Sequence, residues 1–295
     1  MKRNLLLAVA VSALPAAAMA QDITGGMTLS FTQQDVGGPD VDTIGLDGRM
    51  DIDWGNGFTF GLDAGHSTMS MSGTPIELGA EFVGIDGGYR FANGLKVGAY
   101  AERLTLGLNM LPIDLTAKSN GVTLGYEANG LDVEGFVGKS SLSIALPFDI
   151  EDMGVALRYT GKPGLEIGAT FQRLEITDGV DSEHLDFAGV AGSYLVSDAI
   201  IVFGGFASTD VLGASVDTMG LGVGYDLGAK TGFSSTLSLE LASTDIGAGD
   251  NMDTVRLGLS IPLGKKGPMI PINSVADSVL NGRHNALIST LTSAF

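Results

Sequence analysis

The chain has 295 residues, of which 44 are Gly and none is Cys, and it carries 34 Asp and Glu against 16 Lys and Arg. Only 17% of its residues are charged and its mean hydropathy is +0.28, whereas a soluble domain has about 25% charged residues and about 7% Gly. The lack of Cys excludes disulfides, thiol catalysis and Cys-bound zinc, and the net charge of -18 argues against a nucleic-acid partner, whose phosphates need Lys and Arg.

The first twenty residues have the features of a secretory signal peptide. Lys2 and Arg3 are the basic start, residues 5–14 are apolar, and residues 18–20 form an A-x-A cleavage motif. We therefore expect the mature chain to begin at Gln21, and loss of two basic residues changes the net charge from -18 to -20. No uncharged apolar run of about 18 residues follows, so the sequence predicts an exported protein without a transmembrane helix.

A repeat of 33 to 37 residues runs through the rest of the chain, with one short turn rich in Gly or Asn in each unit. Such residues supply the positive φ angles of tight hairpins. The short turns lie at 55–57, 92–94, 128–130, 161–164, 196–198 and 228–232, and longer loops lie near 35–41, 70–75, 108–113, 143–149, 178–183, 209–214 and 244–251. Six turns and seven loops join fourteen strands, of which residues 22–34 would be the first.

Apolar residues alternate with small or polar ones along each expected strand, for example in 58–65, 219–227 and 255–263. This period of two gives each strand one apolar and one polar face. The strands are about ten to thirteen residues long, and a tilted membrane strand needs about 9–11. The sequence thus predicts an all-β fold, a transmembrane antiparallel up-and-down barrel of about 14 strands (12–16), with a soluble β-sandwich or solenoid as the alternative.

Aromatic residues precede the short turns, where a membrane barrel has its interfacial girdle. Since short turns are the periplasmic end of such barrels, we expect a periplasmic aromatic girdle. Its members are Trp54, Tyr89, Phe91, Tyr126, Tyr159, Tyr194 and Tyr225.

With its signal peptide, even strand number, aromatic girdle and C-terminal Phe295, the sequence resembles the porins of Gram-negative outer membranes, particularly the acidic, glycine-rich alphaproteobacterial type. The resemblance covers Gln21 to about Gly264. It implies an outer-membrane location, passive diffusion of small hydrophilic solutes, and contacts with outer-membrane lipid, lipopolysaccharide and the barrel-assembly machinery. Trimeric porins usually have sixteen strands and a long third loop inside the pore, but the loop at 108–112 is short. Monomer and trimer therefore both stay open.

If the large apolar side chains face lipid, their neighbours along each strand face the lumen. The inward acidic residues are Asp47, Asp51, Asp53, Asp63, Asp86, Glu102, Glu127, Asp132, Glu134, Glu166, Asp226 and Glu240, and the inward basic residues are Arg49, Arg90, Lys96, Arg158 and Arg256. An excess of carboxylates raises the local concentration of cations. The sequence predicts a pore-lining role for this set and a weakly cation-preferring channel. The alternative is a charge network that fills the lumen of a non-conducting structural or surface-interaction barrel.

Catalytic and cofactor chemistry find no support in the sequence. A nucleophile needs a base and an orienting group close in space, and none of His66, His184 and His284 stands in such a motif. Carboxylates cluster in several longer loops, but their spacing matches no EF-hand. We expect no enzyme activity, no cofactor and no metal site.

The character of the chain changes after Gly264, so we divide it into the signal peptide (1–20), the barrel (21–264) and a tail (265–295). Asn273 or Ser274 is suited to cap a helix that begins at Val275. A second amphipathic piece covers 287–295, where an alternating strand is the other possibility. The tail would plug the lumen, serve as an assembly signal or be disordered.

Overall fold

A computed structural model describes the chain at residues 22–35, 37–38, 40–110, 114–143, 148–161, 164–178, 181–211, 213–228, 234–247, 251–264 and 269–294. The predicted signal peptide and Phe295 lie outside the described residues. So do Gln21 and residues 265–268, where the predicted tail begins.

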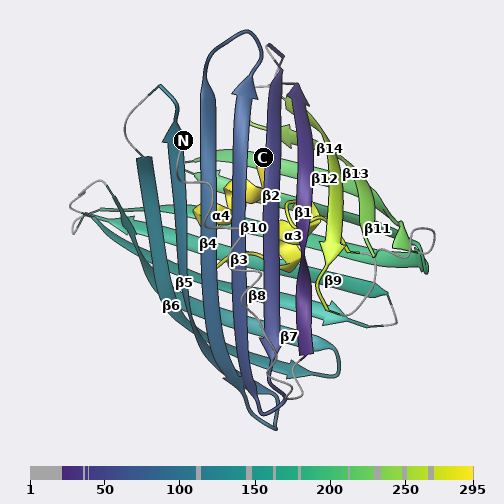
Figure 1. The fold of residues 1–295 in the computed structure, drawn as a ribbon. Coiled ribbons are helices and arrows are strands. Elements are labelled where there is room, and N and C mark those ends of the chain that lie inside the picture. The colour runs from purple at the N-terminus through teal and green to yellow at the C-terminus, as the bar shows by residue number, and fades with distance from the viewer. Residues whose placement is uncertain are drawn as a thin grey trace, which may run out of the picture.

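Fourteen antiparallel strands form a closed barrel in which each strand pairs with its neighbours in sequence and β1 pairs with β14 (Figure 1). They are β1 (Asp22–Asp35), β2 (Val41–Asp53), β3 (Phe58–Met71), β4 (Glu77–Arg90), β5 (Leu95–Leu108), β6 (Asp114–Ala128), β7 (Leu131–Leu142), β8 (Asp149–Thr160), β9 (Leu165–Thr177), β10 (Ser182–Ser197), β11 (Ile200–Val211), β12 (Ala214–Asp226), β13 (Thr236–Asp245) and β14 (Asn251–Pro262). The predicted fold class and strand number are confirmed. Strands β1–β5 run upright in the view of Figure 1, and the green strands of the far wall cross behind them closer to the horizontal.

The turn between β6 and β7 shows why the predicted hairpins form where they do. Asn129 has φ 53° and Gly130 has φ 81°, and two consecutive positive φ angles define the type I′ turn that fits the twist of a two-residue hairpin. Asn and Gly tolerate this conformation, whereas other residues resist it. Local turn chemistry therefore fixes the register of these two strands.

The outer face of the barrel is apolar. Exposed side chains include Leu221 at 70%, Leu124 at 60% and Ile44 at 59% of their full accessible area. In the part of the chain that the structure describes, no helix is long and apolar enough to cross a membrane.

The inner face is polar, as the inward row of β1 shows. Thr28, Ser30, Thr32 and Gln34 are all buried, and Thr28 Oγ1 lies 2.8 Å from the hydroxyl of Ser260 on β14. Buried hydroxyl and amide groups need hydrogen-bond partners. Thr28 and Ser30 find partners both on neighbouring strands and in the tail, where the Ile272 N–H donates to Thr28 and Asn273 Nδ2 donates to Ser30.

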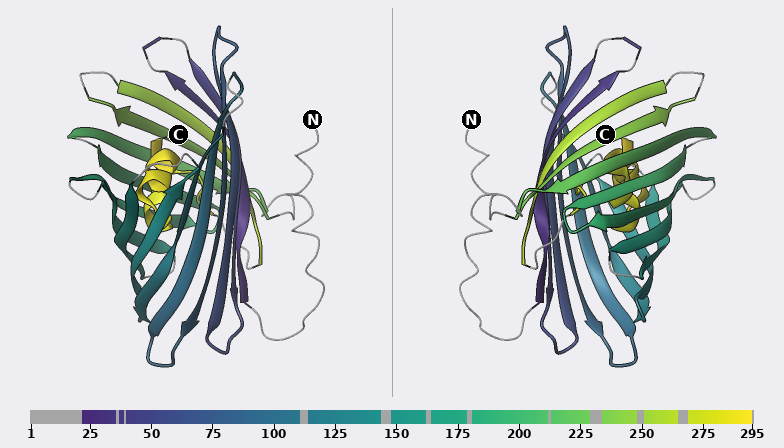
Figure 2. Two further views of the ribbon diagram at one scale, coloured as in Figure 1. Left: turned by 90° about the vertical axis from the view of Figure 1, so that its left-hand side faces the viewer. Right: turned by 90° about the vertical axis from the view of Figure 1, so that its right-hand side faces the viewer.

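The tail lies inside the barrel and contains helices α3 (Val275–Leu280) and α4 (Ala286–Ala294) (Figure 2). Ser274 caps α3, because its Oγ accepts a hydrogen bond from the backbone N–H of Asp277 at 3.1 Å. The prediction of a helical tail is confirmed, and the alternative of a strand over 287–295 is wrong. Packing inside the lumen favours helices, which satisfy their own backbone hydrogen bonds.

Candidate functional site in the barrel lumen

The half of the lumen at the short-turn ends of the strands contains a chamber of about 560 Å³. Its described lining includes nine carboxylates against five Lys or Arg side chains. Residues 280–284 of the tail form one side of it. The charged lining residues are Asp22, Arg49, Asp51, Asp53, Asp63, Asp86, Arg90, Lys96, Glu102, Glu127, Asp132, Glu134, Arg158, Arg283 and His284.

Helix α3 packs on a row of small residues that crosses four neighbouring strands. Gly168, Ala191, Gly205 and Gly220 are paired in register from β9 to β12. A Cβ atom on Gly220 would lie 2.8 Å from Val275 Cγ2, and one on Gly205 would lie 3.2 Å from the Cα of the next helix residue. These distances are closer than ordinary packing allows, so the missing side chains make room for α3.

The segment before α3 is held by hydrogen bonds to inward polar side chains. The backbone N–H of Ile272 donates to Thr28 Oγ1 at 3.2 Å, and that of Val275 donates to Glu240 Oε1 at 3.0 Å. Glu240 is buried, and its other oxygen accepts a hydrogen bond from Arg256, which is also buried. Each ion of this pair thus has a partner, as burial of charge requires.

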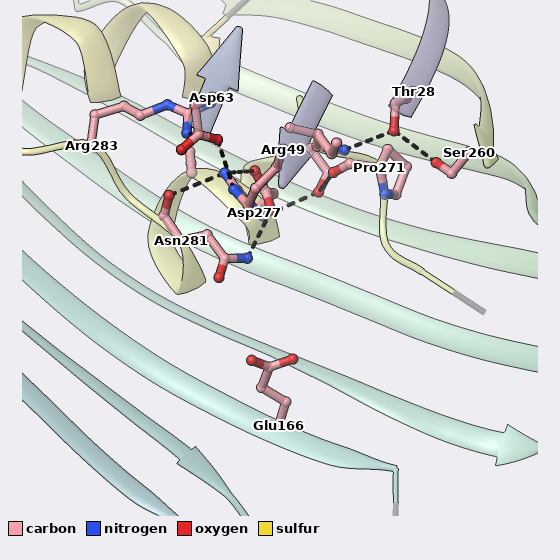
Figure 3. Close-up of polar contacts among 12 residues, drawn as sticks. Thr28, Arg49, Asp63, Glu166, Ser260, Pro271, Asp277, Asn281 and Arg283 are labelled. Atoms are coloured by element: carbon pink, nitrogen blue, oxygen red, sulfur yellow. Dashed lines mark hydrogen bonds and ion pairs between the residues drawn. The ribbon is translucent and has the colours of Figure 1, made fainter. Parts of the chain in front are cut away.

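Arg49 of β2 joins the barrel wall to α3 (Figure 3). Its Nη1 donates to Asp277 Oδ1 at 2.8 Å, and its Nε donates to Asp63 Oδ1 at 2.8 Å. Asp63 also pairs with Arg283 of the tail at 2.5 Å. Two wall residues, Arg49 and Asp63, thus each pair with an oppositely charged residue of the tail, which favours docking because hydrogen bonds between ions are stronger than neutral ones.

His284 is enclosed by four side chains of the wall. Its ring stacks on Tyr100 with centroids 4.1 Å apart and meets Phe136 edge-on at 5.1 Å. Its Nδ1 lies 2.9 Å from Glu102 Oε1, and its Nε2 lies 3.4 Å from Glu134 Oε1. Burial alone would lower the pKa of His284, but hydrogen bonds and charge from the two carboxylates outweigh burial and raise the pKa to about 10. The ring is therefore an imidazolium at neutral pH.

Asn285 connects the start of α4 to β7 and β8. Its Nδ2 donates to Asp152 Oδ1 at 2.9 Å and to Ser140 Oγ at 3.1 Å. Its Oδ1 accepts the backbone N–H groups of Leu287 and Ile288 at 3.0 and 3.2 Å. One side chain thus caps the helix and attaches it to the wall.

Helix α4 joins two apolar clusters on adjoining sectors of the wall, and Leu142 of β7 packs against both clusters. One cluster contains Phe187 of β10 and Val279 of α3, both almost fully buried, together with Ala286. The other contains Leu104 of β5 and Ile288 of α4. The tail therefore meets the wall by apolar packing toward the long-loop ends and by charged groups beside the chamber.

The predicted inward residues occupy three different surroundings. Many line the chamber, as given above, whereas Glu240 and Arg256 are buried beneath the tail and Asp47 lies against Gly65 on the neighbouring strand. Glu166 points into the lumen apart from the tail contacts (Figure 3) and lies 3.8 Å from Arg158. The sequence did not single out Asp277, Arg283 and Asn285 as site residues. Asp277 and Arg283 could have been found because they are charged residues in a largely apolar tail.

The aromatic residues expected in the girdle all lie at or beside the short-turn ends of strands. Trp54, Phe91, Tyr126, Tyr159 and Tyr194 are exposed, whereas Tyr89 and Tyr225 are half-buried. Tyr89 packs edge-on against Phe58 and Phe91 with centroids 5.0 and 4.9 Å apart. Separately, no group of three or more His, Asp or Glu among the described residues is arranged to hold a metal ion.

Comparison with known proteins supports the fold. Similar solved structures include the anion-selective porin from Comamonas acidovorans (TM-score 0.53, 12% identity, 82% of this chain and 100% of that chain). The ΔS2 mutant of the monoaromatic hydrocarbon channel TodX has TM-score 0.53 and 9% identity over 83% of this chain and 90% of that chain. The CymD monoaromatic hydrocarbon channel has TM-score 0.50 and 8% identity over 83% of this chain and 89% of that chain.

At these identities, the likeness establishes a shared β-barrel architecture. No family profile and no curated protein sequence matches the chain. The narrower resemblance to alphaproteobacterial porins stays a prediction.

Proposed function

We propose that the protein is a porin-like outer-membrane channel for small hydrophilic solutes whose lumen is closed by its own tail in this conformation. The carrying observation is the charged chamber of about 560 Å³ on the inner wall of the fourteen-strand barrel. Eight strands already suffice to close a barrel around packed side chains. A wider barrel with a charged inner wall is suited to water and ions.

The apolar outer face supports the proposed outer-membrane location. Exposed Leu221, Leu124 and Ile44 form part of an apolar surface that is stable in lipid and unfavourable in water. Outer-membrane lipid and lipopolysaccharide are the proposed surroundings, and the barrel-assembly machinery is the proposed insertion partner. Cell fractionation, with the heat-modifiable gel migration of a folded barrel as readout, tests this location.

The proposed ion preference is weakly cationic. The described chamber lining contains more carboxylates than basic groups, and fixed negative charge concentrates cations. Reversal potentials across a planar bilayer under a salt gradient test the preference. A reversal potential whose sign indicates anion selectivity would contradict it.

A non-conducting structural barrel is the second candidate, because the tail is packed in the lumen and joins two apolar clusters of the wall. Bilayer recordings of the full chain and of a variant lacking 265–295 separate the two functions. We expect low conductance from the full chain and higher conductance from the variant. No conductance from either barrel, with correct gel migration in both, would support the structural barrel. If the shortened chain fails to insert, the tail acts in assembly and Asp277→Asn replaces the deletion in the recordings.

A further inference from the structure

Four wall residues form what we call the cation cage: Tyr100 of β5, Phe136 of β7, and the carboxylates of Glu102 and Glu134. Tyr100 and Phe136 are 4% and 6% exposed, and their rings meet edge-on with centroids 6.0 Å apart. Aromatic faces and carboxylates together are the chemistry that recognises organic cations. At present the cage holds the imidazolium ring of His284.

The wall shapes the cage without help from the tail. Tyr100 lies over Gly121 and Gly138, where a Cβ atom on Gly121 would approach Tyr100 Cε1 to 2.7 Å. Phe136 lies over Gly154 in the same way, with 2.6 Å to Cε1. The glycines let both rings approach the backbone of the neighbouring strands closely, and packing on the wall fixes their orientation. Such preorganisation favours ligand binding, because little side-chain freedom is left to lose.

Glu102 gives the cage its charge in a nearly dry position. Its side chain is 5% exposed, and Oε1 accepts hydrogen bonds from the backbone N–H and from the ring Nδ1 of His284. Oε2 is buried and has no hydrogen-bond partner among the described residues. A buried carboxylate needs a cation beside it, so an empty cage would favour uptake of a positive ligand.

The cage opens on the chamber, because Glu102, Glu134 and His284 all line it. Arg283, the residue before His284, repeats the pattern: its guanidinium lies 4.6 Å from the centre of the Phe82 ring and pairs with Asp63 at 2.5 Å. Two successive tail cations thus occupy aromatic and carboxylate sites on the wall. A solute that enters the chamber meets the same chemistry that holds the tail.

We propose that the cation cage is a binding site for small planar organic cations of the imidazolium type, and that His284 is an intramolecular competitor for it. The proposal names a class of solute for the channel proposed above. The claim that such solutes are transported rests on that proposed function. The binding itself rests on the cage alone. Binding of such a solute would displace His284 and loosen the tail beside the chamber.

The test is calorimetric titration of imidazole into the full chain in detergent at about pH 5.5, where a free imidazole ring is mostly protonated. We compare the unmodified chain, His284→Ala and the double variant His284→Ala with Glu102→Gln. We expect affinity at least about tenfold higher for His284→Ala than for the unmodified chain, and loss of that gain in the double variant. Pyrazole, a neutral ring of the same size, is the ligand control.

Equal affinity in all three proteins, or equal binding of pyrazole, would overturn the cage. Gel migration of the folded barrel verifies each variant, and His284→Gln takes the place of His284→Ala if the latter does not fold. Bilayer recordings keep the two proposals separate. Binding without conductance would support the cage and contradict the channel. Conductance without binding would support the channel and contradict the cage.

Discussion

Arg49 and Asp277, which are 228 positions apart in the chain, form a two-point contact across the lumen. Arg49 Nη1 donates to Asp277 Oδ1 at 2.8 Å and Nη2 donates to Oδ2 at 3.2 Å. The side chain of Asp277 is only 4% exposed. A paired, planar contact of this kind fixes the direction of α3 as well as its position.

Asp277→Asn removes the negative charge from this contact and keeps its size. We expect docking of the tail to weaken by about 2 kcal/mol, as for loss of one charged hydrogen bond, and the barrel to open more often. Single-channel recording measures the open fraction. Asp253→Asn is the control, because Asp253 bonds Ser243 on the neighbouring strand. An unchanged open fraction in Asp277→Asn would show that this contact does not hold the tail.

Gly138→Ala tests whether the close approach of Tyr100 to the wall supports docking of the tail. The new methyl group would collide with the Tyr100 hydroxyl and lie 2.7 Å from a backbone oxygen, so the ring must leave the position in which it stacks on His284. Overpacking of this kind costs about 1–3 kcal/mol. Limited proteolysis of the tail measures the effect, and we expect faster cleavage.

Gly135→Ala, on the same strand, is the matched control for Gly138→Ala. A Cβ atom there would make only ordinary contacts, at 3.7 Å and beyond. Equal cleavage rates in the two variants would show that the position of Tyr100 does not affect docking of the tail.

The stability of the docked tail should depend on pH because of His284. Because its folded pKa is raised to about 10 from an unfolded value near 6.5, its contribution to stability is complete below about pH 6.5. The contribution falls as pH rises and is lost near pH 10. We expect the difference in Tm between the unmodified chain and His284→Gln to shrink over this range. A difference that grows with pH would contradict the charged pairing with Glu102 and Glu134.

The ion preference of the chamber has its own test in Asp51 and Asp86. They are paired in register with Gly61 from either side, and neither carboxylate forms a side-chain hydrogen bond or ion pair among the described residues. Replacing both by Asn removes two charges, and we expect the reversal potential to move toward zero. Glu77→Gln, at the long-loop end of β4, is the control. An equal shift in both variants would place the selectivity outside the chamber.

Strands and turns were predictable because their causes are local. Alternation of period two, as in 219–227, assigns each residue to a face, and Asn129-Gly130 marks a hairpin wherever the rest of the chain lies. The start of α3 was predictable for the same reason, since Ser274 caps the first turn of the helix that follows it.

The position of the tail depends on contacts between distant residues and could not be predicted in this way. Inward placement of Glu240 and Arg256 was evident from alternation, but their full burial depends on the tail above them. Gly220 leaves space on the inner wall, and that space contains Val275. A single sequence shows where room exists but not which segment fills it.

The row of small residues beneath α3 has a consequence for the mechanics of the barrel. Across β9 to β12, Gly168, Ala191, Gly205 and Gly220 contribute almost no side-chain bulk to the inner surface. Cross-strand side-chain contacts stabilise a sheet, so we expect this sector to bend more easily than the rest of the wall and α3 to brace it. We expect the cross-section to flatten here when the tail leaves, so that the opened barrel is oval rather than round.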